Sequence, residues 1–242
     1  MLSLYLAALL AAGQERILET VLPGADVGPG CSSSMELVNS GSRAASIDLE
    51  AHGPTGALVP GGASLLLAPG ARKTVALEPQ AWVKIRELIP LPRQGPVVSA
   101  RRLTECAAGD RLRTVQRDAA FTMRNPWFAG DAGPAGAFIL FINAAETPAF
   151  ATGCYSSGNF YAVPRSESKP PPFEPLCSET FNVEVPPFAA REFPVERNGS
   201  RWFCLQTRGP SIVLEMLRPA VADDKLFVVD STIRFGSEVT SR

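Results

Sequence analysis

The five cysteines are the residues whose types and spacing indicate chemistry most directly. The sequence repeats itself, and Cys31 and Cys106 of the first copy align with Ala135 and Ala220 of the second. Because both thiols are present in one copy and both are absent from the other, we predict a Cys31–Cys106 disulfide. A bond that closes so long a loop stabilises a fold by about 4 kcal/mol, chiefly by restricting the unfolded chain.

A second pair of cysteines is found only in the second copy. Cys154 and Cys204 align with Glu50 and Lys84 of the first copy, and all four positions fall on the outward phase of their strands. Neighbouring strands would place Glu50 beside Lys84 and Cys154 beside Cys204. This pattern favours a Cys154–Cys204 disulfide, and the competing pair is Cys154–Cys177, which would close an inserted loop. Either choice leaves one thiol for a free or intermolecular role, and paired cysteines indicate an oxidising compartment.

The remaining chemistry-bearing residues do not form a catalytic pattern. His52, the only histidine, aligns with Ser156 just past a strand, so we expect a surface residue near a turn. No G-x-S-x-G elbow, H-E-x-x-H helix, C-x-x-C pair or phosphate-binding glycine loop occurs in the sequence. Asp223 and Asp224 align with a single acid, Asp110, which predicts a turn rather than a calcium site. We therefore predict a protein that is not an enzyme and that holds no metal or cofactor.

Aromatic residues of the second copy form a candidate site for ligand binding. Trp127, Phe160 and Tyr161 occur only in that copy, and with Tyr155 they could line an exposed patch for a glycan or peptide. The alternative for the same residues is a contact between domains. A long insertion, residues 158–180, follows in this copy; its proline-rich sequence predicts an exposed loop.

An internal repeat sets the organisation of the chain. Residues from about 16 to 119 align with residues from about 120 to 236. The ungapped blocks pair 31–52 with 135–156, 65–78 with 183–196, 82–88 with 202–208, and 98–116 with 212–230. A repeat of this length predicts two copies of one folding unit, each with its own core. Trp82 and Trp202 recur at the head of the same strand, and we interpret them as packing residues.

Each copy has the hydrophobic pattern of β-strands. Ile47, Leu49 and Ala51 alternate with Asp48 and Glu50, and similar short runs recur between glycine, proline, asparagine and serine. Period-two alternation is typical of half-buried strands. The 22 prolines disfavour long helices. The sequence therefore predicts an all-β protein built as a sandwich or barrel in each copy.

The N-terminus and the charge indicate location and partners. Residues 1–13 form an apolar run that is too short to span a bilayer, and we predict a signal peptide cleaved before Gln14. The alternatives are a start site placed too far downstream or a buried strand. The formal net charge of −1 disfavours nucleic acid and anionic lipid as partners. Arg101 and Arg102 are interpreted as a solvated strand edge. We expect a secreted, periplasmic or extracellular protein without stable membrane insertion.

Turn motifs in the first copy give the sequence a family resemblance. Leu-Val-Asn-Ser-Gly at 37–41, followed by Leu-Ala-Pro-Gly at 67–70, resembles the immunoglobulin-like β-sandwich repeats of secreted bacterial surface proteins, including CARDB-type adhesion modules. It is also similar to tandem sandwich repeats of exported bacterial proteins of unknown function. The second copy differs by having Phe188 in place of the turn glycine. The resemblance implies two tandem immunoglobulin-like β-sandwiches at the cell surface, with adhesion or scaffolding by analogy.

These features together predict an exported, non-catalytic structural or interaction module. It would bind a protein or glycan through its loops or a sheet edge. The alternative function is that of a periplasmic two-domain assembly chaperone, which acts by β-strand donation. A long unpaired apolar edge strand would favour the chaperone, whereas an exposed aromatic patch would favour ligand binding.

Overall fold

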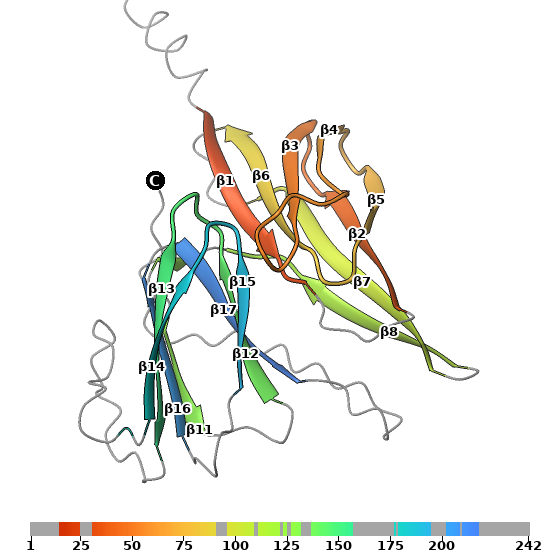
Figure 1. The fold of residues 1–242 in the computed structure, drawn as a ribbon. Helices are drawn as coiled ribbons and strands as arrows, with labels where there is room; N and C mark the ends of the chain where they lie inside the picture. Colours follow the sequence, from red (N-terminus) through yellow and green to blue (C-terminus); the bar gives the residue numbers. More distant parts are fainter. Residues whose placement is uncertain are drawn as a thin grey trace, which may run out of the picture.

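The protein is built from β-strands (Figure 1). The structure is a computed structural model, and it describes residues 15–24, 31–90, 96–108, 111–121, 123–124, 127–131, 137–156, 177, 179–194, 202–208 and 210–217. All regular elements within these ranges are strands joined by turns, and the described residues form no helix. Within the same ranges, no segment has the helical length and apolar character needed to cross a membrane. The prediction of an all-β protein is confirmed.

The first half of the chain forms two antiparallel sheets. Its strands are β1 (Glu15–Leu22), β2 (Cys31–Asn39), β3 (Ala45–His52), β4 (Ala63–Leu67), β5 (Arg72–Leu77), β6 (Trp82–Pro90), β7 (Val98–Ala108), β8 (Arg111–Asp118) and β9 (Ala120–Phe121). Sheet A has the order β4-β3-β6-β1-β9, and sheet B has the order β5-β2-β7-β8. Strand β9 starts just beyond the predicted boundary at residue 119 and still pairs with β1.

The second half also forms two antiparallel sheets. Its strands are β10 (Met123–Arg124), β11 (Trp127–Asp131), β12 (Ala137–Asn143), β13 (Ala149–Ser156), β14 (Glu179–Val185), β15 (Ala190–Pro194), β16 (Trp202–Arg208) and β17 (Pro210–Leu217). Sheet C has the order β10-β17-β12-β15, and sheet D has the order β11-β16-β13-β14. Strands β14-β13-β16-β11 thus follow the same order as β4-β3-β6-β1. Strands β15-β12-β17-β10 of sheet C likewise follow the order β5-β2-β7-β8 of sheet B. The difference is that β10 precedes its neighbour β17 in the chain, whereas β8 follows its neighbour β7.

Each half encloses an apolar core between its two sheets. From Ala45 to Ala51 of β3 the burial alternates residue by residue, which is the pattern that the sequence predicted. The core between sheets A and B contains Leu22, Met35, Leu37, Ala45, Ile47, Leu49, Ala51, Leu67, Leu77, Val83, Ile85, Val98 and Ala100. The core between sheets C and D contains Ile139, Phe141, Ala149, Ala151, Tyr155, Val185, Ala189, Phe193 and Leu205. The two cores are separate clusters, and each is formed by residues of one half only.

A buried asparagine ends the second strand of the first half. The Asn39 carboxamide nitrogen donates to the carbonyl oxygens of Arg43, Leu67 and Ala68 at 2.8, 2.9 and 3.2 Å, and the Gly41 amide donates to Asn39 Oδ1 at 2.8 Å. One side chain therefore joins the loop after β2 to the turn between β4 and β5. A buried amide with all of these partners satisfies carbonyls that would otherwise be stranded away from water.

The equivalent asparagine of the second half makes the same set of bonds. Asn143 Nδ2 donates to the carbonyl oxygens of Thr147, Val185 and Pro186 at 2.9, 3.2 and 3.0 Å, and the Ala145 amide donates to Asn143 Oδ1 at 3.1 Å. Both asparagines are fully buried. The asparagine of the Leu-Val-Asn motif is thus a structural clamp between two loops.

Arg102 is not the solvated residue that the sequence suggested. Strand β7 directs Val98, Ala100 and Arg102 toward the core between sheets A and B, so that Arg102 is only 1% exposed. Its guanidinium donates to Ser33 Oγ at 3.1 Å and to the carbonyl oxygen of Ala81, among other acceptors. The neighbouring Arg101 takes the opposite face and is exposed, as expected.

Candidate functional site

The two halves meet at a third apolar cluster, which we call the junction. Its buried members are Val21 and Trp82 from sheet A, and Phe138, Leu140, Ile142 and Ala144 from the second half, with Phe188 and Ala190 packed against them. Figure 1 shows the strands of the second half lying beside the first half. The interface thus uses the outer face of sheet A and the outer face of sheet C.

Strand β12 explains how the second half can bury two faces. Its sequence, Ala-Phe-Ile-Leu-Phe-Ile-Asn, is almost continuously apolar. Ile139 and Phe141 enter the core between sheets C and D, whereas Leu140 and Ile142 enter the junction. A strand covered on both sides needs apolar residues at both phases. The continuous run is therefore the sequence signature of a strand with partners on both faces.

A stack of three rings lies at the junction. The imidazole of His52 lies between Trp82 and Phe188, with ring centroids 4.7 and 4.6 Å apart and interplanar angles of 21° and 12°. His52 Nδ1 is 3.1 Å from the carbonyl oxygen of Gly56, and His52 Nε2 is 3.6 Å from Glu50 Oε2. His52 is 2% exposed, so the expectation of a surface residue is wrong. The register of β3 and β6 pairs it with Trp82, and the second half covers both side chains.

Phe188 reaches this stack from an unusual backbone conformation. Its φ angle is 56°, in the left-handed region, and its carbonyl oxygen accepts a 3.1 Å hydrogen bond from Trp82 Nε1. The aligned residue of the first half is Gly70, with a φ of 70°. The turn geometry is thus the same in both halves. A non-glycine residue there costs roughly 1–2 kcal/mol, and the ring contacts of Phe188 offset that cost.

Backbone contacts fit the turn of Phe188 against the loop that follows β3. The Ala190 amide donates to the carbonyl oxygen of Pro54 at 2.8 Å. Gly56 has a φ of 91°, and a Cβ atom at this position would overlap the carbonyl oxygen of Pro187. Gly56 is therefore required both for its own conformation and for the close approach of the second half.

A buried lysine fixes the polar margin of the junction. Lys84 Nζ lies 3.3 Å from Glu19 Oε1 and donates to the carbonyl oxygen of Ala144 at 3.2 Å. The same nitrogen lies 5.5 Å from the ring centroid of Phe188, in the range of a cation–π contact. One side chain of the first half thus contacts two residues of the second.

Arg86 completes the charged group on sheet A. Its Nε is 3.2 Å from Glu19 Oε1, and its Nη1 is 2.6 Å from Glu50 Oε1. Glu50 and Lys84 are register partners, as the alignment predicted. Glu50, however, forms its short ion pair with Arg86, because Lys84 is directed toward Glu19 and the second half.

Comparison with known proteins adds a partial match. Residues 11–83 match the model of a family of unknown function, DUF5719. The matched segment contains β1 to β5 and the first two residues of β6, so it includes His52 and Trp82 but no part of the second half. No curated protein and no solved structure matches the chain.

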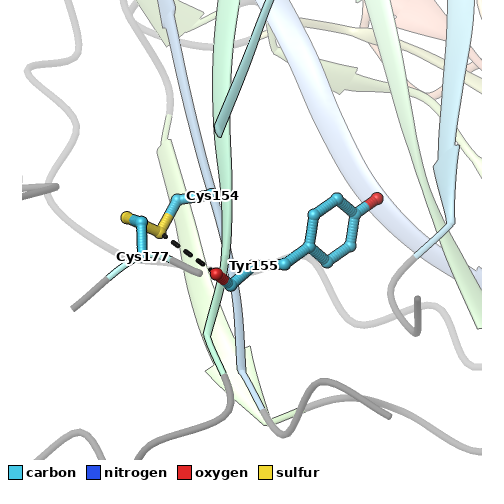
Figure 2. The surroundings of a disulfide bond; sticks show 3 residues. All are labelled: Cys154, Tyr155 and Cys177. Carbon is cyan, nitrogen blue, oxygen red and sulfur yellow. Dashed lines mark hydrogen bonds between the residues drawn. A yellow bond between two sulfur atoms is a disulfide. The ribbon is translucent and has the colours of Figure 1, made fainter. Parts of the chain in front are cut away.

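The disulfide of the second half joins Cys154 to Cys177 (Figure 2). Their Cα atoms are 5.5 Å apart, a usual separation for a disulfide. Cys154 and Cys204 are register partners, as predicted, but the favoured Cys154–Cys204 bond is wrong. Strand β13 has a neighbour on each side, and the chain enters β14 through Cys177. This places Cys177 beside Cys154 on the side opposite Cys204.

The other predicted disulfide is described only in part. Cys31 is disulfide-bonded, and Cys106 is its register partner across β2 and β7. The side chains of Cys106 and Cys204 lie outside the described part of the structure. The Cys31–Cys106 bond and the identity of the unpaired thiol therefore stay predictions.

The aromatic patch does not form as expected around Tyr155. This side chain is 3% exposed, packs in the core between sheets C and D, and donates its hydroxyl to the Pro194 carbonyl oxygen at 2.7 Å. Figure 2 shows its ring on the side of β13 away from the disulfide. Phe160, Tyr161 and the side chain of Trp127 lie outside the described residues. Tyr155 is thus a core residue, and the alternation of β13 explains why.

Several other predictions fall on residues that the structure does not describe. These are the signal peptide at 1–13, most of the inserted loop at 158–180, and the acidic pair Asp223–Asp224. The last residues of that predicted loop belong to strand β14, which begins at Glu179. Among the described residues, no group of three or more histidine, cysteine or acidic side chains is arranged to hold a metal ion.

Sequence reasoning missed Phe188 as a functional residue of the junction. The signal was present, because phenylalanine replaces the glycine of a Pro-Gly turn in an otherwise similar motif. A bulky residue at a position that needs a positive φ is rare unless other contacts hold it there.

Proposed function

We propose that this chain is an exported, non-catalytic interaction module whose two β units are held in one fixed orientation. It acts as an adhesion or scaffold element, and it binds a protein or glycan partner through its sheet surface. The two units are tandem immunoglobulin-like sandwiches that arose by duplication. The matching strand orders of the two halves and the matching bonds of Asn39 and Asn143 support this origin.

The junction is the observation that carries the proposal. Domains in one chain move relative to each other unless their interface is large and apolar. Here the interface contains the stacked rings of His52, Trp82 and Phe188, a buried lysine and a main-chain hydrogen bond. Such an interface suits a module that presents a binding surface at a defined angle and distance.

Two features support export. The Cys154–Cys177 disulfide suits an oxidising compartment. The apolar run at residues 1–13 suits a signal peptide, and the resemblance to repeats of secreted bacterial proteins agrees with both.

Residual dipolar couplings on the full chain test the fixed orientation. We expect the amides of both halves to fit one alignment tensor. In Phe188→Ala, which keeps each core intact and removes a ring of the junction, we expect the halves to need separate tensors. Separate tensors in the unaltered chain would contradict the proposal.

Export is tested in a bacterial host that expresses the chain with its N-terminal segment. We expect the protein in the periplasm with the Cys154–Cys177 bond formed. Cytoplasmic accumulation of the reduced chain would argue against an exported module.

A further inference from the structure

The outer face of sheet D carries a row of uncharged hydrogen-bonding side chains. Ala151, Leu205 and Thr207 are fully buried, so the alternate residues of β13 and β16 face outward. In the register of the sheet, Thr152 pairs with Gln206 on one side and with Asn182 on the other. Thr152 Oγ1 donates to Asn182 Oδ1 at 2.7 Å on the exposed surface. We call Gln206, Thr152 and Asn182 the amide row.

An exposed aromatic side chain flanks the amide row. Phe150 lies two residues before Thr152 on the same face of β13, and it is 51% exposed. Amide and hydroxyl groups beside an exposed aromatic ring provide directional hydrogen bonds together with a flat apolar surface.

The equivalent row of sheet A has a different character. Its register positions hold Glu19, Arg86, Asp48 and Ser64. Arg86 is held by carboxylates of the same face, and Ser64 Oγ donates to Asp48 Oδ1 at 2.6 Å. The serine–aspartate bond of sheet A thus corresponds to the threonine–asparagine bond of sheet D, and the three residues of the amide row lack the charges of their counterparts on sheet A. Charged residues of sheet D lie beside the row, because Phe150 has Glu184 and Arg208 as its register partners on the same face. The amide row is complementary to an uncharged ligand.

We propose that the amide row binds an uncharged glycan across the outer face of sheet D, an inference that rests on the proposed function and names its ligand class. Sugar hydroxyls accept and donate hydrogen bonds with Gln206, Thr152 and Asn182, and a pyranose ring packs on Phe150. Strands β13 and β16 are inner strands, so their main-chain groups are already paired on both sides. An added peptide strand would need a free edge, whereas a glycan binds to side chains on the face.

The test uses the full chain with soluble hexasaccharides of glucose, mannose and N-acetylglucosamine. We expect at least one of these probes to shift the side-chain amide resonances of Gln206 and Asn182 in heteronuclear NMR spectra. Gln206→Ala and Asn182→Ala should each weaken binding by roughly three- to tenfold, the effect of one net hydrogen bond. The matched control is Ser64→Ala, which alters the equivalent position of sheet A and should leave the affinity unchanged.

Three results would overturn the inference. These are no shift with any of the three probes, shifts that map away from sheet D, or an affinity that Gln206→Ala and Asn182→Ala leave unchanged. If the glycan test fails while both halves fit a single alignment tensor, this ligand is excluded and the proposed function stands. Separate tensors would instead remove the fixed module itself.

Discussion

The two halves use one turn in two different surroundings. In both, a buried asparagine holds the loop after its own strand to a turn between two later strands: Asn39 joins the loop after β2 to the turn between β4 and β5, and Asn143 joins the loop after β12 to the turn between β14 and β15. Gly70 and Phe188 occupy the same place in that turn with nearly the same φ angle. A Cβ atom on Gly70 would have no neighbour within 4 Å, whereas the ring of Phe188 stacks on His52 of the other half. The shared bonds fix the fold, and the differences lie where the halves meet.

The outer faces of sheets A and D also differ, because different parts of the chain contact them. On sheet A, the end that carries His52 and Trp82 is covered by the second half. The corresponding end of sheet D carries Cys154, at the position aligned with Glu50, and Cys154 is bonded to Cys177 of the inserted segment. Equivalent positions of a repeated sheet therefore carry different residues according to what covers them.

Of the variants considered, Trp82→Ala should lower the free energy of unfolding most. The side chain is 1% exposed and donates a hydrogen bond across the junction. We expect the free energy of unfolding to fall by about 3–5 kcal/mol, the usual cost of removing a buried aromatic ring. Urea denaturation measures this change, and Phe150→Ala, at an exposed position, should stay within about 0.5 kcal/mol. A loss as small as that of the control would mean that the ring does not hold the halves together.

The disulfide of the second half should contribute next. It closes a segment with a sequence separation of 23, and the double variant Cys154→Ser/Cys177→Ser should lose about 3 kcal/mol of stability. Peptide mapping without reduction should recover Cys154 joined to Cys177, and the control Cys204→Ser should leave that map unchanged. A fragment that joins Cys154 to Cys204 would contradict the Cys154–Cys177 bond and support the pairing that the alignment favoured.

The two asparagines offer a direct test of equivalence. Asn39→Ala and Asn143→Ala each leave buried carbonyl groups without their donor, and we expect each to lose about 2–3 kcal/mol. The exposed Asn182→Ala should change stability by less than about 0.5 kcal/mol. Thermal unfolding of the three variants gives the comparison. Unequal losses at Asn39 and Asn143 would show that the clamp matters in one half only.

The strands and their register could be predicted from the sequence, but the contacts that cover their outer faces could not. Alternation identified β3, and alignment of the copies placed Glu50 opposite Lys84 and Cys154 opposite Cys204, because both patterns depend on local periodicity. The burial of His52 depends on contact with a distant half, which periodicity does not encode. The choice of Cys177 depends on how the chain enters β14, and Cys177 and the first residues of that strand lie outside the aligned blocks.

The positions of Gly70 and Phe188 allow the cost of a positive φ angle at a non-glycine residue to be measured twice. This is the smallest effect that we expect. Gly70→Ala adds a Cβ atom in open space at a φ of 70°, so its expected cost of about 1 kcal/mol comes from the backbone alone. At position 188, both Phe188→Gly and Phe188→Ala remove the ring, but only alanine keeps the strained backbone. The glycine variant should therefore be more stable than the alanine variant by the same amount, about 1 kcal/mol, in urea denaturation. If alanine and glycine at position 188 were equally stable while Gly70→Ala lost stability, the two turns would not share one conformation. Phe188 would then hold the junction without the backbone strain described above.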